Sequence, residues 1–221
     1  MELKTVARVH SPFGSKFGIP RQSSLANTEG RIVFEDAYRN REALRGLEGF
    51  ERIWLIWEFS ANKQAEGEWQ PTVRPPRLGG NTAMGVFATR SPYRPNPLGL
   101  SCVELLAIEN GELIVKGADL MDGTPIYDIK PYLPYADSYP DAKAAWATEA
   151  PTAKLKVLIP KELNLEPEIR DILSLDPRPA YQDSPEKIYG MLYAGRDIKF
   201  KVEGDTLTVL SAIKTPRQSP D

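Results

Sequence analysis

Hydrophobic residues gather along the first half of the chain in short runs that are separated by polar turns rich in proline and glycine. The runs contain many β-branched and aromatic residues, which favour strands. The predicted strands cover residues 3–9, 31–35, 52–59, 84–89, 100–108 and 112–118, and one helix is predicted over residues 35–47. Asn110-Gly111 between the last two strands predicts a tight hairpin. The pattern predicts a mainly β fold, a compact β-barrel, rather than a Rossmann sheet.

After residue 150 the expected elements change in kind. Helices are predicted over residues 161–176 and 186–195, between short strands. Ser184-Pro185 indicates the start of the second helix, because serine caps a helix N-terminus and proline suits its first turn. We therefore expect two domains, a β-barrel over residues 1–150 and a small α+β domain over residues 151–221.

The composition narrows the chemistry. Among 221 residues there is one cysteine, Cys102, and one histidine, His10. A single cysteine forms no disulfide within the chain, and a single histidine leaves no HExxH motif and no Cys/His zinc cluster. The first residues lack the apolar core of a secretory signal, and no apolar run reaches the roughly 18 residues of a membrane-spanning helix. These features predict a cytoplasmic protein without a metal centre.

The distribution of charge indicates an anionic partner. The net charge is −2, yet residues 69–103 contain no Asp or Glu and carry four arginines: Arg74, Arg77, Arg90 and Arg94. A local excess of arginine favours the binding of phosphate or carboxylate groups, which Arg90 and Arg94 are spaced to grip together. Pairing of these arginines with carboxylates from elsewhere in the fold is the alternative. The sequence leaves both open.

Two further stretches hold more polar and conformationally special residues than folding requires. Residues 11–22 form a loop shaped by glycine and proline that presents Arg21 and Gln22. Residues 119–137 contain the turn Asp122-Gly123-Thr124-Pro125. An aspartate in such a turn most often caps its own backbone, but the polar residues clustered directly after it favour a ligand site.

Four sequence motifs identify a family by resemblance. GIPRQ (18–22), PTVRPPRLGG (71–80), GVFATRSPYRPNPLGLS (85–101) and DGTPIYDIKPYLPYAD (122–137) stand in an order and spacing that closely resemble the TsaA-like family. Within it they are most similar to the tRNA methyltransferase O (YaeB- and VirR-like) group. LDPRPAY (175–181) and YGMLY (189–193) match the small C-terminal domain of that group. Most of the chain is covered by the resemblance.

The resemblance implies an S-adenosylmethionine-dependent methyltransferase built on a β-barrel. Its members are homodimers that methylate the exocyclic amino nitrogen of threonylcarbamoyladenosine, next to the anticodon on its 3′ side, in threonine tRNA. The implied cofactor-binding residues are Pro20, Arg21, Gln22, Ser60, Ala61, Arg90, Leu100, Leu120, Asp122, Gly123, Thr124 and Pro125. Many relatives carry His-Gln where this chain has Ser60-Ala61, a departure that leaves backbone contacts possible.

The residues suggest roles within that chemistry. Asp122 is the carboxylate expected beside the cationic sulfonium, and Asp128, Tyr135 and Asp137 are candidate catalytic proton acceptors for the amine. No metal is required. Two alternatives stay open: a non-catalytic RNA-binding module, and a methyltransferase of the same family with a different substrate.

The region after residue 150 is expected to serve tRNA recognition, with bracing of the barrel or the dimer as the alternative. All the implied cofactor turns precede Asp137. We therefore expect the later residues to be dispensable for cofactor binding.

Overall fold

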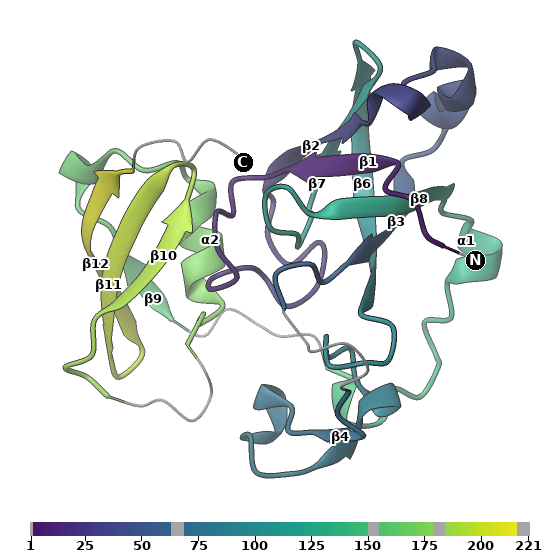
Figure 1. The fold of residues 1–221 in the computed structure, drawn as a ribbon. Helices are drawn as coiled ribbons and strands as arrows, with labels where there is room; N and C mark the ends of the chain where they lie inside the picture. The colour runs from purple at the N-terminus through teal and green to yellow at the C-terminus, as the bar shows by residue number, and fades with distance from the viewer. Residues whose placement is uncertain (1, 63–68, 150–154, 179–183, 216–221) are drawn as a thin grey trace.

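Six strands of the computed structural model close into an antiparallel barrel (Figure 1). The structure describes residues 2–62, 69–149, 155–178 and 184–215. Around the barrel the strands are β1 (Ala7–His10), β2 (Glu29–Phe34), β7 (Glu112–Lys116), β6 (Leu98–Glu109), β3 (Arg52–Glu58) and β8 (Pro125–Pro131). The mainly β, barrel-based fold predicted from the sequence is confirmed.

The alternation of β3 explains how the barrel is filled. Ile53, Leu55 and Trp57 face the interior, and the residues between them are only partly buried. Because successive side chains of a strand point to opposite faces, one apolar face of each strand meets the others inside. Val103 of β6 and Val115 of β7 join the same core. Trp57, at the end of β3, carries this apolar face to one mouth of the barrel.

A second sheet forms the C-terminal part of the described chain. It contains β10 (Tyr189–Tyr193), β11 (Arg196–Glu203), β12 (Thr206–Lys214) and β9 (Lys156–Leu158), in that order. Helix α2 (Glu168–Ser174) buries Ile169, Ile172 and Leu173 in the core of this sheet. The predicted α+β character is confirmed. The predicted domain boundary at residues 150–151 lies outside the described residues, and the division into two domains there remains our proposal.

Smaller elements complete the fold. A two-stranded sheet of β4 (Thr72–Val73) and β5 (Met84–Gly85) lies below the barrel in Figure 1. The short helix α1 (Pro134–Asp137) follows β8. Within the described residues, no helix has both the length and the apolar character needed to cross a membrane.

The prediction of a helix over residues 35–47 is wrong. The chain instead makes three 3₁₀ turns, Asp36–Tyr38, Arg41–Leu44 and Leu47–Gly49. Asn40 caps one of them by accepting a hydrogen bond from the backbone N–H of Glu42, and Gly46 takes a left-handed φ of 85°. None of the three turns fully buries a residue, and Leu44 and Leu47 are only partly buried against the barrel core, so little apolar burial supports a continuous helix.

Two other predicted elements are wrong. The segment 186–195 is not helical, because Tyr189, Met191 and Tyr193 are buried at a period of two and form strand β10. Only the first two residues of the predicted strand 84–89 belong to a strand, and Val86–Ala88 form a 3₁₀ turn. The 3₁₀ turn is closed locally by Thr89 N–H, which donates to the carbonyl of Val86 at 3.1 Å, whereas β10 depends on partners from distant parts of the chain.

Loop 11–22 joins the barrel to the C-terminal sheet. Phe13 is fully buried in the core of that sheet, 5.6 Å from Tyr193 between ring centroids. Gly14 N–H donates to the carbonyl of Leu192 at 3.1 Å, so the loop pairs with the free edge of β10. Phe17 stacks on Tyr189 at 6.3 Å. The C-terminal core is therefore completed by residues from the beginning of the chain.

Candidate active site: a cavity at the mouth of the barrel

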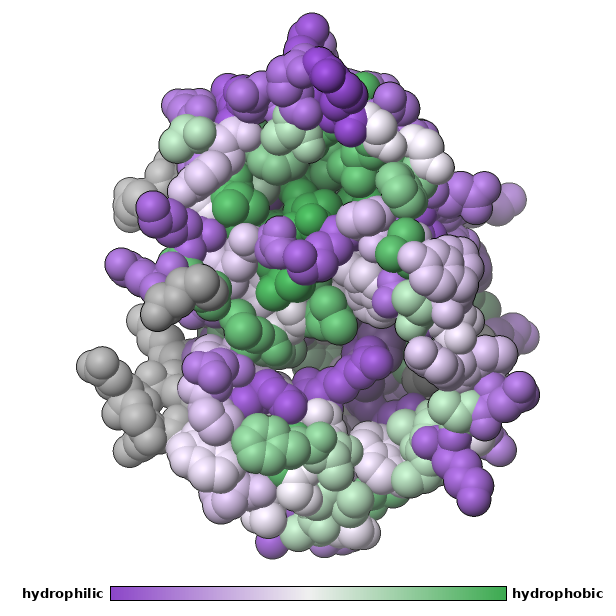
Figure 2. Space-filling model, turned by 90° about the vertical axis from the view of Figure 1, so that its right-hand side faces the viewer, coloured by the Kyte–Doolittle hydropathy of each residue, from purple (hydrophilic) through white to green (hydrophobic). Residues whose placement is uncertain are grey.

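A cavity of about 490 Å³ opens where the end of β3 meets four other segments. Its walls come from residues 16–22, 57–62, 89–94, 98–100 and 119–124. Figure 2 shows this part of the surface as a hollow between the barrel above and the β4–β5 segment below, with hydrophilic side chains across it. The three sequence stretches singled out by their special residues thus converge on one place.

Most of the implied cofactor-binding residues lie in this wall. Those that line the cavity are Pro20, Arg21, Gln22, Ser60, Ala61, Arg90, Leu100 and Thr124. Leu120 is instead buried in the barrel core, where it is 1% exposed. Asp122, Gly123 and Pro125 also lie outside the lining. The structure therefore brings together the PRQ turn, the Ser60-Ala61 turn and Arg90, but only part of the 120–125 turn.

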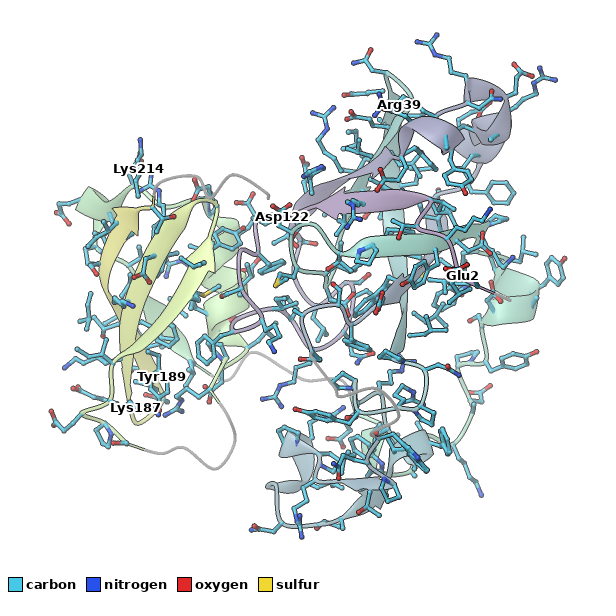
Figure 3. All side chains as sticks on the ribbon, in the orientation of Figure 1. Glu2, Arg39, Asp122, Lys187, Tyr189 and Lys214 are labelled. Atoms are coloured by element: carbon cyan, nitrogen blue, oxygen red, sulfur yellow. The ribbon has the colours of Figure 1, made fainter. Side chains whose placement is uncertain are left out.

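Asp122 fastens its turn to β1. Its Oδ1 accepts the backbone N–H of Ser11 at 3.1 Å and lies 3.4 Å from Nδ1 of His10 (Figure 3). Gly123 N–H donates to the carbonyl of Val9 at 2.8 Å. Asp122 does not line the cavity, so the expectation that it stands beside a sulfonium gains no support from the cavity and stays a prediction.

Asp119 is the aspartate that lines the cavity, and the sequence analysis did not single it out. It is partly buried, and this burial raises the pKa of its carboxyl, while the hydrogen bond from Ser101 and the charge of Arg90 act in the opposite direction. Only a weak sequence signal points to Asp119. It is an aspartate that directly follows Gly117-Ala118, the end of the strand predicted over residues 112–118.

A hydrogen-bonded chain leads from the barrel core to this carboxylate. Trp57 Nε1–H donates to Ser101 Oγ at 3.0 Å, and Ser101 Oγ–H donates to Asp119 Oδ1 at 2.6 Å. Ser101 is 1% exposed. The bond from Ser101 is short, and the bond from Trp57 fixes Ser101 in turn, so the two hold Asp119 in one orientation.

Gly99 permits Trp57 to take this position. The two residues pair across β3 and β6, and the indole ring lies against the glycine. A Cβ atom at Gly99 would stand 2.2 Å from the indole ring. A side chain there would therefore push Trp57 out of the wall.

We expect Gly99→Ala to lower the free energy of unfolding by about 1–3 kcal/mol, the usual cost of overpacking. Thermal unfolding measures the change. Gly85→Ala is the matched control, because Gly85 has an ordinary φ of −58° and open space around its Cβ position. Equal melting temperatures for the two variants would contradict the close approach of Trp57 to Gly99.

Glu58 is a second carboxylate in the lining. It accepts a hydrogen bond from the hydroxyl of Tyr127, which lies on the neighbouring β8. Burial, this hydrogen bond and the charge of Glu58 raise the pKa of Tyr127 to about 12. Tyr127 is therefore protonated at neutral pH. Its hydroxyl donates a hydrogen bond to Glu58 and so orients the Glu58 carboxylate.

The arginines of the wall differ in what they hold. Arg90 Nη1 donates to the side-chain oxygen of Gln22 across the cavity wall. Arg21 Nη2 donates to the carbonyl of Arg178 at 3.3 Å, and burial lowers the pKa of Arg21. Arg94 Nη1 instead donates to backbone carbonyls, the shortest being that of Thr89 at 2.9 Å. The predicted joint grip of Arg90 and Arg94 on an anion is therefore not favoured, since Arg94 holds its own turn.

The three candidate proton acceptors lie outside the cavity lining. Asp128 pairs with Lys130 at 3.0 Å. Tyr135 is 86% exposed in α1. Asp137 accepts hydrogen bonds from Leu133 N–H and Trp54 Nε1–H, which lower the pKa of its carboxyl. A catalytic role for these three stays a prediction that the cavity does not support.

No metal centre is visible in the part of the chain that the structure describes. Over those residues, no group of three or more His, Cys, Asp or Glu side chains is arranged to hold a metal ion. The chemistry of the lining is instead that of arginine, carboxylate and aromatic groups.

Comparison with known proteins decides the family. The sequence profile of the tRNA-methyltransferase O N-terminal domain matches residues 8–138, and that of the TrmO C-terminal domain matches residues 144–215. The chain belongs to the tRNA-methyltransferase O family. The resemblance stated from the motifs is thereby confirmed.

Individual relatives of this family cover most of the chain. A tRNA (adenine(37)-N6)-methyltransferase of Escherichia coli K12 is 42% identical over 91% of this chain and 93% of its own. Another, of Eikenella corrodens, is 47% identical over 70% of this chain and 92% of its own. The crystal structure of TrmO from Pseudomonas aeruginosa superposes with a TM-score of 0.78 at 31% identity and covers 97% of each chain.

Proposed function

We propose that this member of the tRNA-methyltransferase O family transfers a methyl group from S-adenosylmethionine to N6 of adenosine 37 in tRNA. The observation that carries the proposal is the cavity, because segments implied to bind the cofactor converge there from four distant parts of the sequence. Relatives named tRNA (adenine(37)-N6)-methyltransferase are 42% and 47% identical. We further propose that the acceptor is the exocyclic amino nitrogen of threonylcarbamoyladenosine in threonine tRNA.

The residues of the cavity suit S-adenosylmethionine. A cavity of about 490 Å³ falls within the range of small-molecule sites. Trp57, Phe59 and Leu100 offer apolar surface for an adenine ring. Arg90 suits the methionine carboxylate, and the carboxylates of Glu58 and Asp119 suit a sulfonium cation. Ser60 and Ala61 line the same cavity, and we propose that their backbone contributes to the contacts with the cofactor.

Asp119 is our proposed proton acceptor. When bound, S-adenosylmethionine supplies an electrophilic methyl group. An amino nitrogen that takes up this methyl group would have to lose a proton, which the carboxylate of Asp119 would accept. The raised pKa of Asp119 brings its basicity nearer to neutral pH, and Ser101 holds its orientation. Alignment of donor and acceptor in the cavity supplies much of the remaining acceleration.

In the decisive experiment the protein is incubated with S-adenosylmethionine and with tRNA that contains threonylcarbamoyladenosine but lacks its methyl group. The nucleosides are then analysed by mass spectrometry. We expect one methyl group on threonylcarbamoyladenosine, with a rate that EDTA leaves unchanged. Methylation of another nucleoside would support the alternative substrate. Absence of S-adenosylmethionine binding in isothermal titration, with RNA binding retained, would favour the RNA-binding module.

We also propose that the protein works as a homodimer in the cytoplasm. Tyr135 and Tyr139, on and after α1, are 86% and 72% exposed and offer the aromatic surface that an interface core favours. Light scattering at micromolar concentration measures the assembly. An active monomer would contradict the proposal.

A further inference from the structure

Exposed aromatic side chains gather beside the cavity, on the segment that contains β4 and β5. Phe87 is 71% exposed, Tyr93 47% and Trp69 42%. The rings of Trp69 and Phe87 are stacked, with centroids 6.1 Å apart and planes 28° from parallel. We call Trp69 and Phe87 the aromatic platform; Tyr93 is tied to the same segment through its backbone carbonyl, which accepts Gln70 N–H at 3.3 Å. Large aromatic groups that share one exposed place mark an interaction site more often than isolated ones do.

The aromatic platform is joined to the cavity through Arg94. The guanidinium carbon of Arg94 lies 5.8 Å from the centroid of the Phe87 ring, and the same residue lines the cavity. Its Nη1 donates to the carbonyls of Val86 and Thr89, which flank Phe87 in the turn. Arg94 therefore fixes the position of Phe87 relative to the cavity wall.

The segment that carries the aromatic platform contains basic residues and no acidic ones. Residues 69–103 contain no Asp or Glu. Within the ranges that the structure describes, none of the four arginines of this segment takes part in an ion pair. Arg74 and Arg77 are exposed, and Arg77 donates to the backbone carbonyl of Glu149. Among those residues no ion pair engages Arg74 or Arg77, so the charge of these two exposed side chains remains available to phosphate.

We propose that the aromatic platform stacks nucleobases next to the methylated adenosine, while Arg74 and Arg77 contact the adjoining phosphates. The inference rests on the proposed function and locates its RNA contacts. A base inside the cavity stays covalently joined to its neighbours, so those neighbours must lie on the surface at its mouth. Unpaired bases stack on aromatic rings and arginine planes, and the rings suit every base because each has a π face.

The test uses the full-length protein and three substitutions of Phe87. The probe is an anticodon stem–loop RNA, whose KM in methyl transfer and Kd by fluorescence anisotropy are measured beside the Kd of S-adenosylmethionine. We expect Phe87→Ala to raise the KM and Kd for RNA about tenfold or more. Phe87→Leu, which keeps apolar area without a π face, should behave similarly, and Phe87→Trp should bind as the wild type does. The affinity for S-adenosylmethionine should not change.

Two further variants test charge and location. Arg74→Gln should weaken RNA binding and reduce the slope of log Kd against log salt by about one, because one phosphate contact is lost. Ile213→Ala is the control, since Ile213 is 65% exposed but lies on β12 of the C-terminal sheet, and it should leave RNA affinity unchanged.

Several outcomes would overturn the inference. One such outcome is that Phe87→Ala binds RNA with wild-type affinity while the wild type methylates tRNA. The role of the aromatic platform would then be wrong, and the proposed function would still hold. Dissociation of a dimer by Phe87→Ala, with Phe87→Leu retaining it, would show that a second copy covers this surface. If the wild type does not methylate tRNA but RNA binding still depends on Phe87, the platform stands and the proposed function falls.

Discussion

Asp119→Asn is expected to lower the turnover number of methyl transfer by roughly two to four orders of magnitude, the usual contribution of a positioned proton acceptor. Asparagine keeps the shape of the side chain and its contact with Ser101, but it cannot accept the proton from the amine. The Kd of S-adenosylmethionine should change little. Single-turnover methyl transfer and isothermal titration separate these two effects.

The raised pKa of Asp119 also predicts how stability and the methyl-transfer rate change with pH. Burial raises the pKa of Asp119 above the value that it has in the unfolded chain. Its contribution to stability is therefore complete below the unfolded pKa and is lost as the pH rises through the folded pKa. Above the folded pKa the ionised carboxylate is a cost to the fold, so in that pH range Asp119→Asn should melt at the wild-type temperature or above. The acid limb of the wild-type rate profile should disappear in this variant.

Two variants serve as controls for Asp119. Ser101→Ala removes a hydrogen bond that lowers the pKa of Asp119, so the acid limb of the rate profile should move to higher pH. Asp122→Asn should leave the turnover number within a few-fold of the wild type, because Asp122 binds Ser11 outside the cavity lining. A weaker Kd for S-adenosylmethionine with an unchanged turnover number in Asp119→Asn would identify Asp119 as the partner of the sulfonium instead.

Removal of all residues after Glu149 is expected to abolish S-adenosylmethionine binding. The C-terminal core buries Phe13 and partly buries Phe17 and Ile19 from the loop that forms one wall of the cavity. Gly18 meets the same core, because a Cβ atom there would lie 2.5 Å from Cε of Met191. Without the sheet, these apolar side chains would face water and the loop would lose its backbone pairing. This reverses our expectation from the sequence that the later residues are dispensable for cofactor binding.

Phe13→Ala in the full-length chain tests the same coupling more gently. Loss of a fully buried phenylalanine costs about 3–5 kcal/mol, and the Kd of S-adenosylmethionine should rise with it. Leu210→Ala is the control, because Leu210 is 42% exposed on β12 and takes no part in that core. Isothermal titration and thermal unfolding are measured for both variants and for the shortened chain. A shortened chain that folds and binds S-adenosylmethionine with wild-type affinity would restore the original expectation.

Elements set by local sequence were predicted well. The strand β3 and the hairpin at Asn110-Gly111 depend on residues within a few positions of each other, and the structure confirms both. The motifs that identify the family are equally local. The residues of the PRQ turn and Arg90 were recognised by resemblance, and the structure places them in one cavity, although their contact with the cofactor remains a proposal.

What the sequence determined by itself is therefore the fold class, the family and most segments of the cavity, because each is carried by short patterns of residue type. Tertiary structure alone decided the rest. The strand β10 exists because residues 12–14 and β11 pair with its two edges, contacts that no local pattern predicts. Likewise, Asp119 rather than Asp122 faces the cavity because Ser101 and Trp57, from two other strands, hold it there. The conformation of β10 and the orientation of Asp119 thus depend on residues distant in sequence. Burial stabilises them only after the chain has brought those residues into contact.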